Sequence, residues 1–213
     1  MRKSKIPFFL INFFTILFFG SCSTLNVVEG YEERMVVKDV VQNPYFADPQ
    51  IDYVYKANIT VYGNELTGIF IAKKINETTH RIVFTTEFGN TLLDFEISET
   101  DFKVNAIVDE LNRKILITTL KEDFRLLLKK DFAIERQFTK GNEEVLKSNF
   151  EKNDLYLFRS LSDTKLLKIA QTSKTKEKKT ISFASENGIF ADTIVIQHYN
   201  LKLRIALNYF KQN

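Results

Sequence analysis

The sequence predicts a mainly β protein, in which an antiparallel sheet buries one apolar face under an amphipathic helix. Two observations carry this prediction. From Asp52 onward, apolar and polar residues alternate between short turn sequences, which is typical of strands that bury one face. Near the middle of the chain the period changes, and apolar residues recur at i, i+4, i+7 and i+8, which is typical of a helix with one apolar stripe.

Residues 1–21 are predicted to be an export signal that is removed from the mature chain. Three basic residues precede an apolar run over residues 6–19, and Gly20 and Ser21 stand directly before Cys22. The run is shorter than the roughly 20 apolar residues that a transmembrane helix needs. A basic start, a short apolar run and small residues at its end indicate a cleavable signal peptide.

Cys22 is the only cysteine of the chain. Its position resembles the lipobox of bacterial lipoproteins, which implies that Cys22 is acylated and becomes the first residue of the mature protein. The alternative is an ordinary signal peptide, in which Cys22 has no role. Because an exported protein with a lone cysteine has no disulfide partner for it, we favour acylation, which also gives stable membrane attachment through several acyl chains.

The charge balance argues against a nucleic-acid partner. The whole chain has 30 Lys+Arg and 27 Asp+Glu, and the three extra basic residues lie in the signal. The mature chain therefore lacks the net basic surface that nucleic-acid binding requires. Its length suffices for one sizeable domain, which we expect over residues 51–213. Residues 22–50 are expected to be the lipid anchor and a tether, with either a strand or a short helix at Met35–Val41.

Five short strands with intervening turns are expected to follow as an antiparallel meander. They are Tyr53–Tyr62, Glu65–Lys73, Arg81–Phe88, Thr91–Ser98 and Phe102–Ala106, with turns at Gly63-Asn64, Asn76–Thr79, Gly89-Asn90 and Glu99–Asp101. Glycine and asparagine at these turns readily adopt the backbone conformations that hairpins require.

A helix is predicted over Thr119–Lys130. It begins with the capping-box sequence Thr119-Leu120-Lys121-Glu122 and carries an apolar stripe that includes Phe124. The preceding segment is ambiguous, since Asp109–Arg113 could be a turn that leads into a strand at Lys114–Thr118.

The last third of the chain is predicted to return to strands after a polar connection over residues 135–153. The expected strands are Leu155–Ser160, Leu166–Thr172, Thr180–Ser185, Ile189–His198 and Leu201–Phe210, with Asn187-Gly188 opening the last hairpin. The basic tract Lys174–Lys179 is interpreted as a solvated hairpin tip, and contact with anionic lipid head groups is the alternative.

Motifs for catalysis, metal binding or cofactor binding are not found. His80 and His198 are far apart and have no Cys, His or carboxylate at ligand spacing, so we expect strand residues and no metal site. Asp94 and Glu96 share a strand face with Ser98, and we interpret them as a solvated surface rather than an acid/base pair. The sequence also lacks nucleotide-binding glycine motifs. We therefore predict neither an enzyme nor a cofactor.

The apolar face is the remaining candidate for function. A curved antiparallel sheet with a helix over its opening can enclose a cavity for an apolar ligand. The candidate lining residues are Phe70, Phe84, Leu93, Phe95, Ile97, Phe102, Leu120, Phe124 and Leu127. The alternative is that these side chains simply form a filled core.

Several segments resemble the outer-membrane lipoprotein receptor LolB and its soluble relative, the carrier LolA. They are the first hairpin, the segment Val83–Phe95 with its turn at Phe88-Gly89-Asn90-Thr91, and the final hairpin with Phe190–Ile196 and Leu201–Leu207. This resemblance implies a half-open antiparallel β-barrel capped by helices. It also implies that Phe88 and Gly89 form a loop that engages the membrane. The chain departs from the LolB pattern at Glu87 and Ala191, where that family has proline, and it contains no tryptophan.

Together these features predict a lipid-anchored protein of the bacterial outer membrane that binds acyl chains in an apolar cavity. We favour an orientation that faces the periplasm, and the cell surface is the alternative. The resemblance implies lipoproteins or another amphiphile as the ligand, insertion of lipoproteins into the outer membrane as a role, and a LolA-like periplasmic carrier as a partner. The alternative is a non-enzymatic envelope scaffold with a filled core that binds a protein partner.

Overall fold

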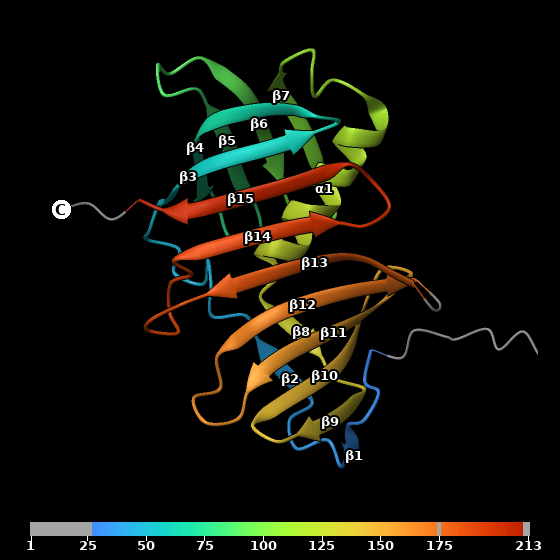
Figure 1. Ribbon diagram of the computed structural model, residues 1–213. Helices are drawn as coiled ribbons and strands as arrows, with labels where there is room; N and C mark the ends of the chain where they lie inside the picture. The colour runs from blue at the N-terminus through green and yellow to red at the C-terminus, as the bar shows by residue number, and fades with distance from the viewer. Residues whose placement is uncertain (1–26, 174–175, 211–213) are drawn as a thin grey trace, which may run out of the picture.

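The computed structural model describes residues 27–173 and 176–210, which form one large antiparallel sheet, a small two-stranded ribbon and one helix (Figure 1). The large sheet has the strand order β1 (Glu32–Arg34), β9 (Arg136–Lys140), β10 (Glu143–Phe150), β11 (Asn153–Ser160), β12 (Leu166–Ser173), β13 (Lys176–Ala184), β14 (Thr193–His198), β15 (Leu203–Tyr209), β3 (Tyr53–Val61), β4 (Asn64–Lys74), β5 (His80–Thr85), β6 (Thr91–Ile97) and β7 (Phe102–Ile107). The ribbon pairs β2 (Val40–Gln42) with β8 (Asp131–Ala133). The helix α1 spans Lys114–Leu128.

The sheet consists of two meanders that are joined side by side. The strands β3 to β7 form the first meander and β9 to β15 the second, and β15 pairs with β3 in antiparallel register from Leu203 opposite Val61 to Tyr209 opposite Tyr55. Since β1 and β7 each have only one neighbour, the sheet is curved but not closed. The predicted fold class, a half-open antiparallel sheet with one covering helix, is confirmed.

The first hairpin follows the predicted alternation closely. Tyr55, Ala57, Ile59 and Val61 of β3 are buried on the concave face. The turn lies one residue earlier than predicted, at Tyr62 and Gly63, and both have positive φ angles, 49° and 93°. Two successive positive φ angles match the right-handed twist of the flanking strands.

The predicted strand Arg81–Phe88 is too long, because β5 ends at Thr85. A register shift follows Phe84, and the backbone of β5 there approaches Gly68 of β4 so closely that a Cβ on Gly68 would lie 1.8 Å from the Thr85 carbonyl oxygen. Phe88 therefore lies in the β5–β6 turn and does not share a strand face with Phe84.

The helix begins five residues before its predicted start, so the expected capping box and the strand expected at Lys114–Thr118 are both wrong. The Thr119 hydroxyl donates to the carbonyl oxygen of Ile115 at 2.8 Å, which is the bond of a residue inside a helix. Leu116 lies one turn before Leu120 and is fully buried with it. Burial of this longer apolar stripe against the sheet, rather than the local capping sequence, determines where the helix starts.

The polar connection predicted over residues 135–153 is also wrong, because this segment contains β9 and β10. The adjacent residues Val145 and Leu146 are both buried, but in separate clusters on opposite faces of the sheet. A strand that buries both faces shows no alternation, so its period was not visible in the sequence.

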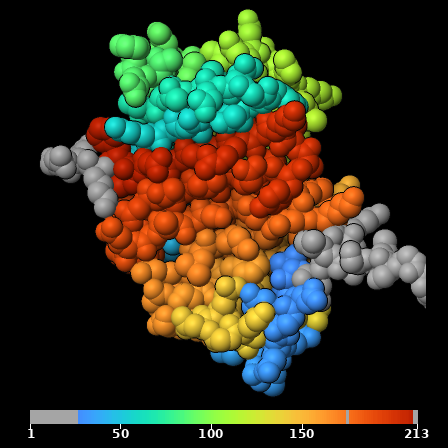
Figure 2. All heavy atoms as spheres, viewed as in Figure 1, coloured from blue at the N-terminus to red at the C-terminus, as the bar shows by residue number. Residues whose placement is uncertain are grey.

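Residues 27–50 pack on the rest of the domain. Val27, Val28 and Tyr31 cover a small convex cluster that includes Phe138 and Phe158, and Figure 2 shows this N-terminal segment in blue against the yellow β9–β10 hairpin. Val41, Tyr45 and Phe46 belong to the main core, and Met35–Val41 is neither one strand nor a helix, since β1 ends before it and β2 begins within it. Cys22 and the signal sequence lie outside the described residues.

The basic tract Lys174–Lys179 is mostly strand. Its last four residues belong to β13, and Lys174 and Thr175 lie outside the described residues. Only Lys176 of those four is exposed, so the interpretation of the tract as a solvated hairpin tip is wrong for most of its length. Within the residues that the structure describes, no helix is long and apolar enough to cross a bilayer.

We predict that Gly68→Ala destabilises the fold by about 1–3 kcal/mol, because the added methyl group meets the fixed backbone of Thr85. Urea unfolding followed by circular dichroism measures the loss. Gly141→Asn is the matched control, since nothing lies within 4 Å of a Cβ there and asparagine tolerates its φ of 57°. Equal stability of Gly68→Ala and the wild type would contradict the close approach of β4 and β5.

Candidate functional site

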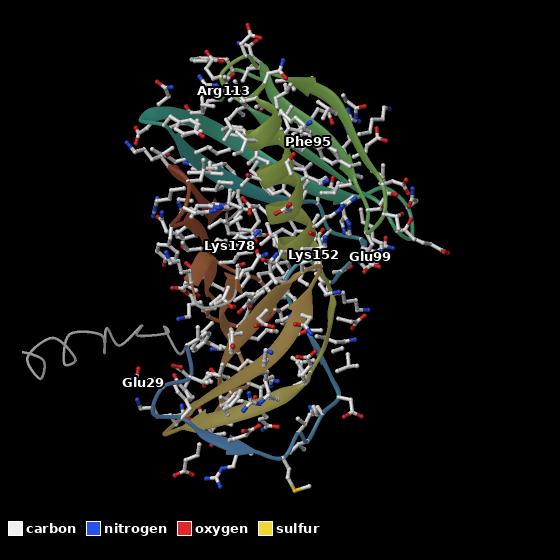
Figure 3. All side chains as sticks on the ribbon, turned by 90° about the vertical axis from the view of Figure 1, so that its right-hand side faces the viewer. Glu29, Phe95, Glu99, Arg113, Lys152 and Lys178 are labelled. Carbon is white, nitrogen blue, oxygen red and sulfur yellow. The ribbon has the colours of Figure 1, made fainter. Side chains whose placement is uncertain are left out.

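The nine residues predicted to line a cavity lie together on the concave face of the first meander and on α1. Eight of them are buried, and Phe102 is half-buried against the same core. Figure 3 shows α1 within the curve of the upper strands, with Phe95 beside it. The prediction that these residues converge on one apolar interior therefore matches their positions.

This part of the interior is occupied by the side chains of the helix. The Phe124 ring lies between the rings of Phe70 and Phe95, with centroid distances of 5.6 Å and 6.4 Å. The Phe95 ring also contacts Phe102 at 5.0 Å. These tilted and edge-to-face pairs are favourable aromatic packing, so in this conformation the predicted lining residues mainly contact one another.

A pocket of about 240 Å³ opens where the interior reaches the surface at the C-terminal end of α1. We call it the mouth pocket. Its lining residues come from the β4–β5 and β6–β7 turns, the helix end and the β10–β11 hairpin: Thr78, His80, Ile97, Ser98, Glu99, Arg125, Leu128, Lys129, Phe150 and Glu151. Figure 3 shows how these parts meet, with Lys152 of the β10–β11 turn near the lower end of the helix and Glu99 across from it.

The mouth pocket is amphipathic. Ile97, Leu128 and Phe150 supply apolar surface that is continuous with the main core, whereas Glu99 and Lys129 carry charges at its edge. Apolar walls with a few charged groups at the opening are typical of a site that takes the chain of an amphiphile and leaves its polar end in water. Of the nine predicted lining residues, Ile97 is the one that lines this pocket.

His80 forms one wall of the mouth pocket. It is the first residue of β5, as its interpretation as a strand residue requires, and it lies between Lys74 and Ile97 on the neighbouring strands. Burial, and to a smaller extent the charge of Lys74, lowers the pKa of His80 from 6.5 to about 4. The imidazole is therefore neutral at pH 7 and adds no charge to the pocket.

Arg125 ties the helix to the first meander at the edge of the mouth pocket. Its Nε donates to the carbonyl oxygen of Ser98 at 2.8 Å, and its Nη2 donates to the carbonyl oxygen of Asp101 at 3.1 Å. Both acceptors belong to the β6–β7 turn, so the guanidinium holds one side of α1 against that turn.

A buried charged network ties the other side of α1 to the second meander. Asp123 of the helix is fully buried; its Oδ1 accepts a hydrogen bond from Lys179 Nζ at 2.7 Å, and its Oδ2 lies 2.8 Å from His198 Nε2. The side chains of Lys179 and His198 are only 4% and 6% exposed. Breaking a buried charge network by removing one partner is strongly destabilising, so Asp123 fixes where the helix lies on β13 and β14.

This network is not among the features predicted from the sequence, although the sequence contains one signal of it. Asp123 occupies a position on the apolar stripe of the helix, three residues after Leu120 and four before Leu127, where an acid has to be buried. Lys179 and His198 are likewise two residues from Ile181 and Ile196 on inward-facing strand positions. A charged or polar residue on an apolar face needs a buried partner, but the partners of Asp123 lie 56 and 75 residues away in the sequence.

Asp94 and Glu96 lie on the same convex face, as predicted, and the side chain of Asn105 bonds both carboxylates. The Asp94 carboxylate is not freely solvated, because Arg81 donates to it from Nε at 3.0 Å and from Nη2 at 2.7 Å. This bidentate pairing lowers the pKa of Asp94. The Arg81–Asp94 ion pair links β5 to β6, and neither residue lines the mouth pocket.

The loop at Phe88 and Gly89 carries a solvent-exposed aromatic ring. Phe88 is 95% exposed, and the turn beneath it is closed by the Gly89 amide, which donates to the Thr86 carbonyl oxygen, and by the Asn90 amide, which donates to the Thr86 hydroxyl. Gly89 has a φ of +86°, which favours glycine. Among the described residues, no group of three His, Cys, Asp or Glu side chains is arranged to hold a metal ion.

Structure comparison finds similar solved structures among bacterial proteins of very different sequence. A LolA superfamily protein from Nitrosomonas europaea aligns with a TM-score of 0.52 and 10% identity over 79% of this chain and 88% of its own. A DUF1329 family protein from Desulfovibrio piger aligns with a TM-score of 0.44 and 10% identity over 78% of this chain and 86% of its own. A protein domain named for outer membrane lipoprotein sorting from Vibrio parahaemolyticus aligns with a TM-score of 0.42 and 8% identity over 75% of this chain and 83% of its own. No protein-family model and no curated protein matches the sequence.

At 10% identity, the likeness to the Nitrosomonas europaea structure is one of fold. It confirms the expected LolA-like architecture, a half-open antiparallel sheet with a helix on its concave side. The resemblance to LolB in particular remains a prediction.

We predict that Asp123→Asn destabilises the domain by about 3–5 kcal/mol, since it leaves the buried Lys179 ammonium without its counter-charge. Urea unfolding measures the loss. A triple variant, Asp123→Leu with Lys179→Met and His198→Leu, should regain most of it, because an apolar replacement removes the buried charges together. An Asp123→Asn protein as stable as the wild type would contradict the network.

We also predict that His80 makes the domain less stable in acid. Its pKa is lower in the folded protein than in the unfolded chain, so protons bind the unfolded chain preferentially and stability falls as the pH drops from about 6.5 to about 4. The variant His80→Asn should lose less stability than the wild type over this range. Above pH 7 the free energy of unfolding of both proteins should change with pH in the same way. Urea unfolding at pH 7.5 and 4.5 tests the difference, and parallel losses in both proteins would refute this role of His80.

Proposed function

We propose that this protein is a lipid-anchored component of the bacterial cell envelope that binds acyl chains of lipoproteins, or of another amphiphile, between α1 and the concave face of its sheet. The observation that carries the proposal is the mouth pocket. It joins a charged surface edge to the continuous apolar core directly beside a helix end. The shared LolA-like fold supports it, since the architecture places an apolar concave face under a helix.

Binding a whole acyl chain requires the helix to move. The mouth pocket holds about 240 Å³, less than the roughly 300–1,000 Å³ of ligand pockets that enclose a drug-sized molecule. Acyl methylenes that enter it can extend inward only where the side chains of Leu128, Leu127 and Phe124 give way. Transfer of the methylenes out of water lowers their free energy, and α1 then acts as a lid.

The polar contacts of α1 fit this role as a lid. Arg125 holds the helix to the β6–β7 turn, and Asp123 holds it to β13 and β14. The Arg125 contacts are only partly buried and can be exchanged for water, whereas the Asp123 network is buried. Motion that releases Arg125 while keeping Asp123 in place opens the mouth pocket toward the first meander.

Membrane attachment completes the proposal. Acylation of Cys22 would anchor the protein in the outer membrane on its periplasmic side, and the exposed Phe88 would engage lipid when cargo is delivered. In a LolB-like role, the protein would accept lipoproteins from a LolA-like periplasmic carrier and assist their insertion into the outer membrane.

A second candidate function is a non-enzymatic envelope scaffold that keeps a filled core and binds a protein partner. One observation favours it: Phe124 fills the space between Phe70 and Phe95. The two functions differ in whether α1 ever leaves this position.

We predict that the protein without residues 1–22 binds a fluorescent fatty-acyl probe, and that Leu128→Glu weakens binding at least tenfold by placing a charge on the floor of the mouth pocket. Fluorescence titration measures both affinities. Leu167→Glu is the control, because Leu167 is exposed and lies outside the mouth pocket. Failure of every acyl probe to bind the wild type would reject acyl binding and favour the scaffold.

A further inference from the structure

A row of polar side chains crosses the concave face of the second meander. Gln171 of β12 stands opposite Lys179 of β13, and Lys179 stands opposite His198 of β14. On the other side, Gln171 stands opposite Leu155 of β11, and Leu155 opposite Ser148 of β10. Residues directly opposite on adjacent antiparallel strands have neighbouring side chains. We call Ser148, Gln171, Lys179 and His198 the polar row, and all four are buried.

The next row toward the interior is entirely apolar. Two residues along each strand, the same pairing joins Leu146, Leu157, Ile169, Ile181 and Ile196 in one line across the same five strands. All five are buried in the main core. The concave face of the second meander thus changes from polar to apolar within one step of the strand period.

Two members of the polar row lack the partners that buried polar groups normally have. Asp123 satisfies Lys179 and His198, but within the described residues Gln171 Oε1 and Ser148 Oγ have no hydrogen-bond partner. Burying such an atom without a partner is costly, and each case in a folded protein calls for an explanation.

A pocket of about 130 Å³ lies between this row and the helix. Gln171, Lys179 and His198 form its wall on the sheet, and Ile115, Thr119 and Glu122 form its wall on successive turns of α1. It is separate from the mouth pocket, which shares none of these residues. The unpartnered Gln171 therefore borders a space that a small polar group can enter.

The donors and acceptors of this pocket select the chemistry of its ligand. Gln171 Oε1 needs a donor, whereas the Lys179 ammonium has three protons and gives one of them to Asp123. A carboxylate or phosphate could accept from Lys179 and from Gln171 Nε2 but would leave Gln171 Oε1 without a donor, whereas an ammonium group could donate to Oε1 but could not accept from Lys179. A hydroxyl group does both. The pocket carries no net charge that would favour an ionic group. The charge of Asp123 balances that of Lys179, and the charge of Glu122 balances that of Lys178.

We propose that this pocket binds the uncharged, hydroxyl-bearing head group of an amphiphile, of the kind found in a monoacylglycerol. The head group lies against the polar row, with one hydroxyl donating to Gln171 and accepting from Lys179, and the attached chain follows the apolar row from Ile169 to Ile196. The inference rests on the proposed binding of acyl chains and adds the class of head group that this protein prefers.

The test compares two photoreactive probes that share one acyl chain, a diazirine-bearing monoacylglycerol and the corresponding methyl ester, on the full chain extracted from membranes in mild detergent. We expect the wild type to be labelled by the monoacylglycerol about five- to tenfold more efficiently than by the methyl ester, with labelled peptides from β12 to β14. Gln171→Leu should label equally with both probes at the methyl-ester level of the wild type.

Two controls separate recognition from misfolding. Gln171→Leu should melt no lower than the wild type, because it removes a buried acceptor that has no partner. Gln197→Leu makes the same change on β14, two strands from β12, at a position outside this pocket and should keep the preference. Equal labelling of the wild type by both probes, or a preference that survives Gln171→Leu, overturns the head-group site while acyl binding stands. Absence of labelling by either probe overturns acyl binding as well.

Discussion

The buried contacts that the Asp123 carboxylate makes with Lys179 and His198 determine how α1 lies on the sheet. The sheet is too wide for one helix of fifteen residues to cover. The apolar stripe of α1 packs on the first meander, and without a specific contact to the second meander it could slide or tilt along an apolar surface that has little directionality. A buried carboxylate with two partners from β13 and β14 removes that freedom, because any displacement leaves charges buried without partners.

The two halves of the concave face consequently differ. In the first meander the helix supplies the missing core, and Phe124 lies between Phe70 and Phe95. In the second meander Tyr45 of the N-terminal segment contributes to the core by packing its ring on Phe183 of β13, and the polar row lies beside the helix. The two pockets flank α1 at the boundary between these halves. The helix is therefore held on two sides, by Arg125 beside the mouth pocket and by Asp123 beside the polar row.

The sequence predicted well those elements whose burial is one-sided. The strands β3, β4 and β6 and the last hairpin show the alternation of a sheet with one solvent-exposed face. Their ends lie within two residues of the predicted ones, except that β14 begins at Thr193 and not at Ile189. Errors occurred where a second surface covers the strand or the helix. The sequence predicts a connection in place of β10, because Val145 and Leu146 are buried on opposite faces and the strand shows no alternation. It predicts a helix start at Thr119, because local capping signals do not show that Leu116 is buried.

By itself the sequence determined the class of the fold, the apolar side chains that would meet inside it and the absence of recognisable catalytic motifs, because these depend on composition and on the local period of burial. Only the tertiary structure decided that Phe124 fills the interior that it was expected to line, that Asp123 meets Lys179 and His198, and that Gln171 borders a pocket. These outcomes depend on which faces of distant segments come together, and a one-dimensional pattern specifies that a face is buried but not what it is buried against.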